Sequence, residues 1–286
     1  MTRAQAKEGL ARAGFAAAAG ICILAVALIC VFLFANGVPA ISEIGVADFL
    51  LGTKWKPGND IYGIFPMIVG SIYATAGAVI VGVPSGFLCA VFLSRFAGKG
   101  VGRFLSHGVE LLAGIPSVVY GFFGLVVIVP LVRQLFGGSG SSLLAACLLL
   151  GMMILPTIIS VSEAALNAVP ASYYEGALAL GATHERAVFS VVLPAAKSGV
   201  MAGIILGIGR AIGEAMAVMM VAGNRTGIPK SLFKGVRTLT SNIVMEMGYA
   251  ADLHREALIA TAVVLFVFIL IINLLFSILS HSGKKQ

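Results

Sequence analysis

The chain has 286 residues, of which 59% are hydrophobic and 11% are charged, and its mean hydropathy is +1.03. A soluble globular domain of this length does not have such a composition, so the sequence indicates a membrane protein. The formal net charge of +7 is no argument for a nucleic-acid partner, because membrane proteins commonly carry lysine and arginine in their loops.

Six long apolar segments follow one another along the chain. Uncharged runs cover 13–42, 61–94, 111–132, 134–162 and 257–283, and a sixth run over 198–224 is interrupted only by Arg210 and Glu214. Each run exceeds the roughly 20 residues that a helix needs to cross about 30 Å of hydrocarbon, and none alternates as the strands of a barrel do. We therefore expect an all-α polytopic fold, with transmembrane helices near 13–36, 66–94, 109–132, 142–164, 198–222 and 257–280.

The first span follows Arg3, Lys7 and Arg12, as the apolar region of a signal peptide would. Its apolar region is longer than the 7–15 residues typical of such peptides, which favours a retained helix. Six spans place both termini on one side of the membrane. With the N-terminus inside, the cytoplasmic segments carry ten Lys and Arg residues against eight on the other side, which is a weak bias.

The chain is expected to divide into three parts. Residues 1–60 would hold the first helix and an outer loop, residues 61–280 the main transmembrane domain, and residues 281–286 a cytoplasmic tail. Trp55, in the turn before the second span, has two interpretations: an anchor at the membrane interface, or part of a docking surface for a substrate-delivery protein.

Pro116 interrupts the third span, beside Ser117 and Tyr120. A helix broken here would free backbone amides and hydroxyl groups to line a path through the membrane. Alternatively, Pro116 only kinks the helix while Ser117 bonds to its own backbone.

Between the fourth and fifth spans, residues 170–197 predict a short helical hairpin at the membrane surface. Ser172 and Glu175 have the spacing of a capping box after Pro170, and Gly181 stands where a helix end favours positive φ. Thr183 is a candidate cap for a second helix, with Glu185 in its first turn, ending before Pro194. The alternative is an ordinary structural loop in which Glu175 acts only as a cap.

The fifth span carries two charged residues, Arg210 and Glu214, at a helical i,i+4 spacing that would let them neutralise each other. At 100° per residue from Gly199, these two and the glycines at 203 and 207 all fall within an arc of about 80°. Glycines allow close helix contact, so we expect the charged pair to face the bundle or a translocation path. Arg210 is then either a ligand for a substrate in transit or half of an ion pair that joins two helices.

Other motifs for chemistry are missing from the sequence. Cys22, Cys30, Cys89 and Cys147 fall inside the predicted spans without a CxxC pair, and the four histidines make no ligand pattern. No Walker-A loop or GxGxxG motif is present. We therefore expect no metal or cofactor on this chain and no nucleotide hydrolysis by it. The loop 223–256, which includes Glu246, is expected to be solvated.

The Glu-Gly-Ala-x-x-x-Gly pattern at 175–181, followed by Leu193 and Pro194, resembles the EAA loop of permease subunits of ABC importers. In that family the loop forms coupling helices that seat in a groove of the ATPase. The resemblance implies that Glu175, Ala177 and Gly181 dock on such a partner, with Leu193 and Pro194 closing the loop. Gly176 stands where the family usually has alanine, at a cost of about 1 kcal/mol in helix propensity.

Further motifs resemble phosphate-specific members of that family, over about residues 60–280. They are the segments 114–124, 209–218 and 221–224, while 236–240 and 246–248 fit the PstC type better than the PstA type. The resemblance implies one half of the path of a phosphate importer, with Arg210, Glu214, Ser117 and Tyr120 along it. The planar fork of Arg210 would then meet the oxyanion, and Glu214 would hold that fork or repel the anion onward.

The resemblance also implies partners and a location. They are a PstA-type permease subunit, a PstB-type ATPase dimer that binds ATP and Mg, a PstS-type binding protein outside, and the lipid of a bacterial inner membrane. The open alternatives are a permease for another oxyanion (sulfate, molybdate or phosphonate) and, from a different class, a transporter or channel driven by an ion gradient.

Overall fold

The computed structural model describes residues 3–282 of the chain, so Lys284 and Lys285 of the expected tail lie outside the described residues. The elements, in order, are α1 (Arg3–Ile44), α2 (Val46–Leu51), β1 (Trp55–Lys56), η1 (Pro57–Asn59), β2 (Ile61–Tyr62), α3 (Phe65–Val91), η2 (Phe92–Phe96), α4 (Lys99–Gly114), α5 (Ser117–Phe123), η3 (Gly124–Ile128), α6 (Val129–Phe136), α7 (Leu143–Asn167), α8 (Ala171–Ala179), α9 (His184–Ala187), η4 (Val188–Val192), α10 (Leu193–Gly213), α11 (Met216–Val221), α12 (Leu239–Glu246) and α13 (Asp252–Ser282).

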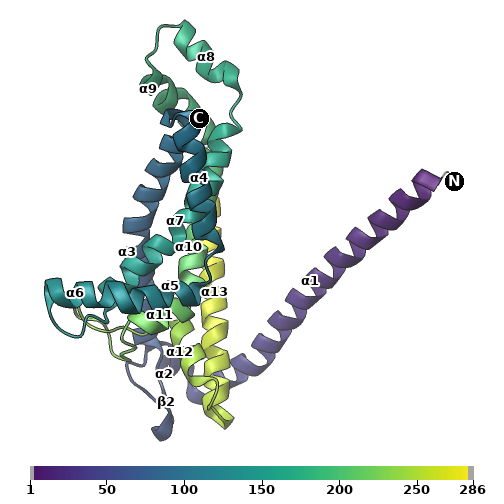
Figure 1. Ribbon diagram of the computed structural model, residues 1–286. Coiled ribbons are helices and arrows are strands. Elements are labelled where there is room, and N and C mark those ends of the chain that lie inside the picture. Colours follow the sequence, from purple (N-terminus) through teal and green to yellow (C-terminus); the bar gives the residue numbers. More distant parts are fainter. Residues whose placement is uncertain (1–2, 283–286) are drawn as a thin grey trace.

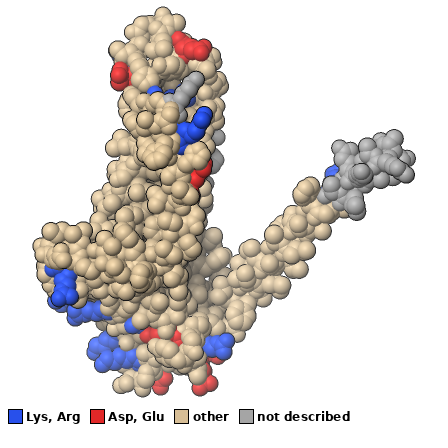
Figure 2. All heavy atoms as spheres, viewed as in Figure 1, with Lys and Arg blue, Asp and Glu red and all other residues tan. Residues whose placement is uncertain are grey.

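Four long helices, α3, α7, α10 and α13, run along a common axis (Figure 1). The helices α8 and α9 lie beyond one end of this bundle, which we call the hairpin end. The short hairpin of β1 and β2 lies at the other end with α2 and α12, and we call this the loop end. Charged side chains gather near these two ends, and the face between them is largely free of charge (Figure 2). An uncharged belt of this kind is what a hydrocarbon layer requires.

Among the described residues, six helical stretches are long and apolar enough to cross a membrane. They are Arg12–Ile44, Phe65–Phe96, Ser117–Phe136, Leu143–Asn167, His184–Gly213 and Asp252–Leu275. The all-α fold with six candidate spans is therefore confirmed, whereas the predicted boundaries of the third and fifth spans are wrong.

The core of the bundle is the contact of α7 with α3 on one side and α10 on the other. Glycines bring these helices together: a methyl group added at Gly199 of α10 would lie 2.4 Å from the Cβ of Ala165, and one at Gly77 of α3 would lie 2.2 Å from the Sγ of Cys147. No side chain fits at either position without movement. The prediction that the glycine stripe of the fifth span packs closely on another helix is thus confirmed.

The third span is broken rather than continuous. Helix α4 ends at Gly114, because Ile115 and Pro116 have extended backbone with ψ of 126° and 144°, and α5 begins at Ser117. The residue before a proline disfavours helical ψ, which accounts for the break at this place. The segment α5–η3–α6 then runs across the bundle axis instead of continuing α4 (Figure 1).

The fifth span begins earlier and ends earlier than predicted. A continuous helical run extends from His184 to Gly213, and Glu214 then becomes extended, with ψ of 125°, before α11 starts. The hydroxyl of Thr240, on α12, donates to the carbonyl of Glu214 over 2.9 Å. This contact with a distant segment holds the chain outside the helix.

Two π-helical turns, η3 and η4, each end two residues before a proline, Pro130 and Pro194. A proline in a helix has no N–H to donate and its ring crowds the carbonyl four residues earlier. Widening the preceding turn removes that conflict, so the helix continues past the proline instead of breaking.

Helix α1 leaves the rest of the molecule near the loop end and diverges from it (Figure 1). It contacts α13 through its last part, where Gly37 meets Val263 and Ala260 closely and the rings of Phe34 and Phe266 lie 6.1 Å apart. The 18-residue stretch of α1 that is most apolar is not buried at all within this chain.

Candidate functional site

The first candidate site is the hairpin end. Helix α8 forms as predicted, but Pro170 is its N-cap residue and no side chain caps it, so the predicted capping box of Ser172 and Glu175 is wrong. Gly181 has φ of 82°, as its position at the helix end predicts. Thr183 caps α9 by accepting a hydrogen bond from the amide of Arg186 over 3.4 Å, with Glu185 in the first turn.

The predicted end of the second hairpin helix before Pro194 is also wrong. α9 continues through η4 into α10, so the hairpin is one free helix, α8, joined to the beginning of the fifth span. α9 and the span that carries Arg210 are therefore parts of one continuous helical run.

The tip of the hairpin is uncovered. Glu175 and Gly181 are exposed, Ala177 is half-buried, and the side chain of Leu180 is 91% exposed. The position of α8 is set from inside, where the hydroxyl of Tyr174 lies 2.7 Å from Nδ1 of His184 and the ring of Phe96 packs edge-on against that imidazole.

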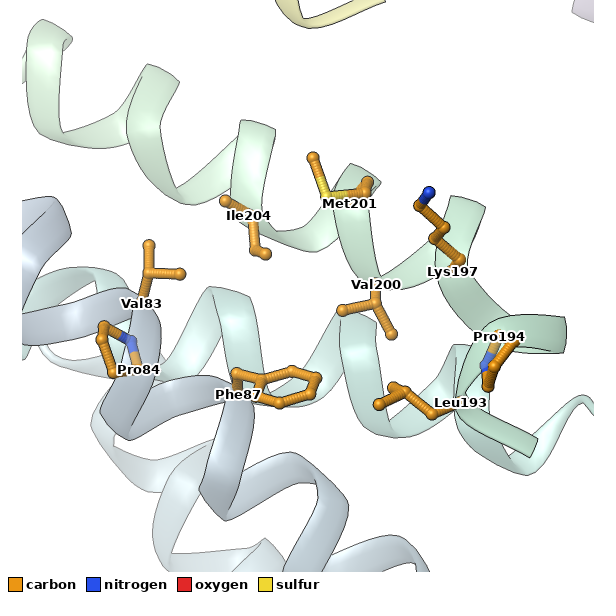
Figure 3. A pocket seen from close by; sticks show the side chains of 9 residues that line it. All are labelled: Val83, Pro84, Phe87, Leu193, Pro194, Lys197, Val200, Met201 and Ile204. Atoms are coloured by element: carbon orange, nitrogen blue, oxygen red, sulfur yellow. The ribbon is translucent and has the colours of Figure 1, made fainter. Parts of the chain in front are cut away.

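Leu193 and Pro194 lie away from the tip, in a groove of about 580 Å³ between α10 and α3 (Figure 3). Eight of its nine lining side chains are apolar, and the ninth is Lys197. The two residues thus form the start of α10 rather than part of the exposed surface of α8.

The second candidate site surrounds Arg210, in the last turn of α10. Its guanidinium donates to the hydroxyl of Thr157 on α7 over 3.3 Å, and the Tyr120 hydroxyl is near enough to interact with it electrostatically. Arg210 is half-buried. No carboxylate pairs with it in the part of the chain that the structure describes.

The expected pairing of Arg210 with Glu214 is therefore not found. Glu214 is the residue directly after α10, and its extended ψ turns the chain that follows it away from the helix axis. The carboxylate of Glu214 instead accepts the amide of Ala217 over 3.0 Å, at the start of α11. The guanidinium is left with one neutral partner and unused donors, which is a suitable state for contact with an anion.

Ser117 and Tyr120 lie on α5, directly after the break in the third span. Ser117 is half-buried, and Tyr120 is buried with its hydroxyl donating to the carbonyl of Leu112 over 2.9 Å. This bond satisfies one of the carbonyl groups at the end of α4. The alternative that Pro116 only kinks a continuous helix is wrong, because the chain leaves the helical conformation for two residues.

Sequence reasoning missed a polar cluster at the loop end, which we call the Glu246 cluster. Glu246 was expected to be solvated, yet it is 6% exposed. Its carboxylate accepts hydrogen bonds from Nε1 of Trp55 over 2.8 Å and from Arg237 over 2.5 Å, and it lies 2.9 Å from Nε2 of His254. Asn242 accepts a further bond from Arg237 over 3.0 Å. The only signal in the sequence was the presence of these polar residues in outer loops far apart along the chain.

Trp55 is therefore neither an interfacial anchor nor part of an exposed docking surface. It is 5% exposed, and its ring packs edge-on against Tyr62. Burial raises the pKa of the Tyr62 phenol, and its hydrogen bond to Asp60 and the charge of that carboxylate raise it further. For Tyr249, burial and the nearby charge of Glu246 raise the pKa, and the charge of Arg237 partly opposes this.

In the described residues, no group of three His, Cys, Asp or Glu side chains is placed to hold a metal ion. What the fold and these two sites define is a multi-pass helical membrane protein. It has an exposed hairpin at one end, and an arginine in a candidate membrane-spanning helix has no carboxylate partner among residues 3–282.

Comparison with known proteins gives the family. Residues 82–282 match the family described as "Binding-protein-dependent transport system inner membrane component", and the chain belongs to it. It is 40% identical to "Probable ABC transporter permease protein YqgH" of Bacillus subtilis, over 91% of this chain and 88% of that protein. It is 37% identical to "Phosphate transport system permease protein PstC" of Pasteurella multocida, over 77% of this chain and 75% of the relative.

Among solved structures, the fold resembles that of a bacterial alginate ABC transporter in complex with a pentasaccharide-bound periplasmic protein. The TM-score is 0.66 with 16% identity, and the match covers 98% of both chains. At this identity the likeness bears on the fold alone. The permease fold expected from the sequence is thus confirmed.

Proposed function

We propose that this chain is the permease subunit of an ATP-driven importer of phosphate, and that Arg210 is a ligand for the anion in transit. The observation that carries the proposal is the guanidinium of Arg210 inside a membrane span without a carboxylate partner in the described residues. A charged side chain near the centre of a bilayer costs about 2.5–3.5 kcal/mol on insertion scales, so it is typically found where it has a function. The relatives named as phosphate transport permeases support phosphate as that anion.

The neutral partner of Arg210 supports a weak hold on the substrate. A guanidinium that donates one bond to Thr157 keeps four N–H groups for an oxyanion, in a planar fork that matches two of its oxygens. A transporter must release what it binds, and the half-buried Arg210 is not enclosed completely by this chain, so an anion that meets it has a way out. Glu214 supports the site indirectly, as the group that starts α11 beside it.

Coupling to the ATPase is assigned to α8, through Glu175, Ala177 and Gly181. The continuous helical run from His184 to Gly213 supports this, since about 26 residues at 1.5 Å each separate the hairpin from Arg210 by roughly 39 Å along one helix. A displacement of the hairpin by the ATPase would move the anion site through this helix. This relay is a hypothesis with two positions of the hairpin and the helix attached to it. It requires that the ATPase and the anion each bind one of these two positions more tightly than the other.

The partners follow from this role. They are a second permease of the PstA type, a PstB-type ATPase dimer that carries ATP and Mg, and a PstS-type binding protein at the loop end. The hairpin end and both termini would face the cytoplasm of a bacterial cell, with the chain in the inner membrane. The 10:8 distribution of cationic residues agrees in direction but contributes little.

The test is uptake of labelled phosphate by cells that lack their own high-affinity phosphate importer and express this chain with its partners. Uptake that needs the chain and is unaffected by excess sulfate is the expected result. An assembled complex that takes up no phosphate would leave a permease for another oxyanion. A chain that transports without any nucleotide-binding partner would instead favour the gradient-driven class.

A further inference from the structure

Helix α4 is amphipathic, and this chain covers only one edge of its polar face, at Ser106. At about 100° per residue, Arg103, Ser106, His107 and Glu110 all fall within an arc of roughly 100°. The side chains of Arg103, His107 and Glu110 are exposed. We call these four residues the polar face of α4.

Contacts with α7 show how deep this face lies. The hydroxyl of Ser106 lies 3.4 Å from the carboxylate of Glu163, near the end of α7 at Asn167. Further along, Val109 packs with Leu155 and Ile159, close to the middle of α7. Glu110 is therefore level with a stretch of α7 that lies about 12–18 Å from Asn167, inside the membrane-spanning layer.

A polar face at this depth cannot be turned towards lipid without a large cost. An ionised side chain in the hydrocarbon costs about 2.5–3.5 kcal/mol on insertion scales, and such residues almost always face water or protein. Within residues 3–282, no ion pair involves Arg103, His107 or Glu110. The face therefore needs water or another protein against it.

The polar face also leads to the anion site. α4 ends at the carbonyl of Leu112, which accepts the hydroxyl of Tyr120, and that hydroxyl is within electrostatic reach of Arg210. These two contacts connect the end of α4 to Arg210, and α4 runs from there towards the hairpin end (Figure 1). An anion that moves from Arg210 to the hairpin end therefore passes along α4, and it needs water on its way, which contact with a partner protein alone would not supply.

We propose that the polar face of α4 lines the translocation path between Arg210 and the hairpin end, and that a hydrated oxyanion passes along it. Arg103 and His107 offer donors to the anion, and Glu110 lowers the positive potential so that the anion is not trapped. The identity of the anion rests on the proposed function, whereas the hydration of the face rests on burial and depth. Arg103, His107 and Glu110 are thereby positioning residues for the substrate.

The test is cysteine accessibility in the assembled complex, in a variant whose four native cysteines are alanine. Single cysteines replace His107 and Glu110, and the control cysteines replace Phe104 and Leu111. These control residues lie on the same turns of α4, are 79% and 75% exposed, and are apolar. An anionic, membrane-impermeant methanethiosulfonate is added from the hairpin side.

We expect the cysteines at 107 and 110 to react at least about tenfold faster than those at 104 and 111, because a thiol ionises to the reactive thiolate only where it is hydrated. Phosphate should slow the reaction at 107. Cysteines at 107 and 110 that react in the isolated chain but not in the complex would show a partner subunit covering the face, and would overturn the proposal. Cysteines at 107 and 110 that react neither in the isolated chain nor in the complex would show that lipid covers the polar face of α4, and this result would overturn the proposal as well.

The two proposals fail in distinguishable ways. Phosphate uptake together with unreactive cysteines at 107 and 110 would keep the proposed function and remove this path. Reactive cysteines that phosphate does not protect, in a complex that takes up no phosphate, would keep the hydrated face and remove phosphate as the substrate.

Discussion

Arg210 and Thr157 form the pair of side chains on which the proposed anion site depends, and the two would contribute differently. Arg210 carries the charge and the planar set of donors, while Thr157 only fixes one end of the guanidinium. The absence of a carboxylate partner in the described residues means that substituting Glu214 should affect the start of α11 more than the charge of Arg210.

Arg210→Lys should keep the cation and lose most of the transport. A charge-assisted hydrogen bond is worth roughly 1.5–3 kcal/mol, so the loss of the fork should lower uptake by about one to two orders of magnitude. The measurement is initial uptake rate at matched expression. Thr157→Val is the control, because it removes the hydrogen bond and keeps the guanidinium, and its effect should be smaller. Wild-type uptake by the lysine variant would contradict a bidentate contact.

Glu246→Gln should destabilise the loop end. The substitution removes the negative charge that faces Arg237 and His254, and it replaces an acceptor oxygen with an NH₂ group that meets other donors. Breaking a buried ion pair on one side costs roughly 3–5 kcal/mol. Thermal unfolding in detergent measures the effect. Glu256→Gln, at an exposed carboxylate on α13, is the matched control and should change stability little.

At the scale of elements, α9 and α10 form one continuous unit, because the π turn η4 lets the helix pass Pro194. Helix α8 is attached less firmly. No residue of it is buried, and among the described residues its side-chain hydrogen bond is the one between Tyr174 and His184. An element of this kind can adapt to the surface of another protein.

Gly181→Ala should strain the hairpin, and Gly176→Ala should not. Gly181 has φ of 82°, and a Cβ in this conformation costs about 1–2 kcal/mol although no atom lies within 4 Å of it. Gly176 is in the helix α8, also with open space around it, and alanine there gains about 1 kcal/mol of helix propensity. Transport and ATP hydrolysis should fall in the first variant and stay at or above wild type in the second. Equal effects of the two would argue against a role for the turn.

Glu175→Lys should separate ATP hydrolysis from transport or weaken assembly. Glu175 is exposed and makes no cap, so the fold has no need of its charge. The ratio of phosphate transported to ATP hydrolysed, in purified complex, is the quantity to measure. Glu185→Lys serves as a comparison at an exposed carboxylate of α9. Normal coupling in the Glu175 variant would count against docking through this residue.

At the scale of the whole molecule, the main helix contact between α1 and the bundle in the described residues is the one with α13. The close approach depends on Gly37, since a Cβ there would lie 2.6 Å from Cγ2 of Val263 and 3.1 Å from Cα of Ala260. The rest of α1 lies apart from the bundle, so its apolar surface is left to lipid or to other subunits.

Gly37→Val should separate the two helices and destabilise the protein. Overpacking at a close contact typically costs about 1–3 kcal/mol. Gly20→Val places the same side chain on the same helix, where no atom lies within 4 Å, and should stay within roughly 0.5 kcal/mol of wild type. Thermal stability and limited proteolysis between α1 and α3 report the difference. Equal stability of the two variants would contradict a role for this contact.

The sequence by itself determined the features that depend on neighbouring residues. An apolar run that is long enough to cross the bilayer predicts a span, whatever other segments pack against it. The positive φ of Gly181 and the cap by Thr183 each depend on a few adjacent residues. The EAA pattern belongs to the same class, because its residues lie in one short segment. The number of spans, the φ of Gly181 and the cap by Thr183 agree with the structure, whereas the capping box of Ser172 and Glu175 does not form.

Only the tertiary structure decided where the fifth span ends and which polar groups meet. Arg210 and Glu214 have the spacing of a helical pair, but a hydrogen bond from Thr240 holds Glu214 outside the helix. Trp55 and Glu246 bind each other across 191 residues, a contact that no local pattern indicates. The physical reason is that a buried polar group takes whichever partner the packing brings to it, and local sequence does not specify that partner.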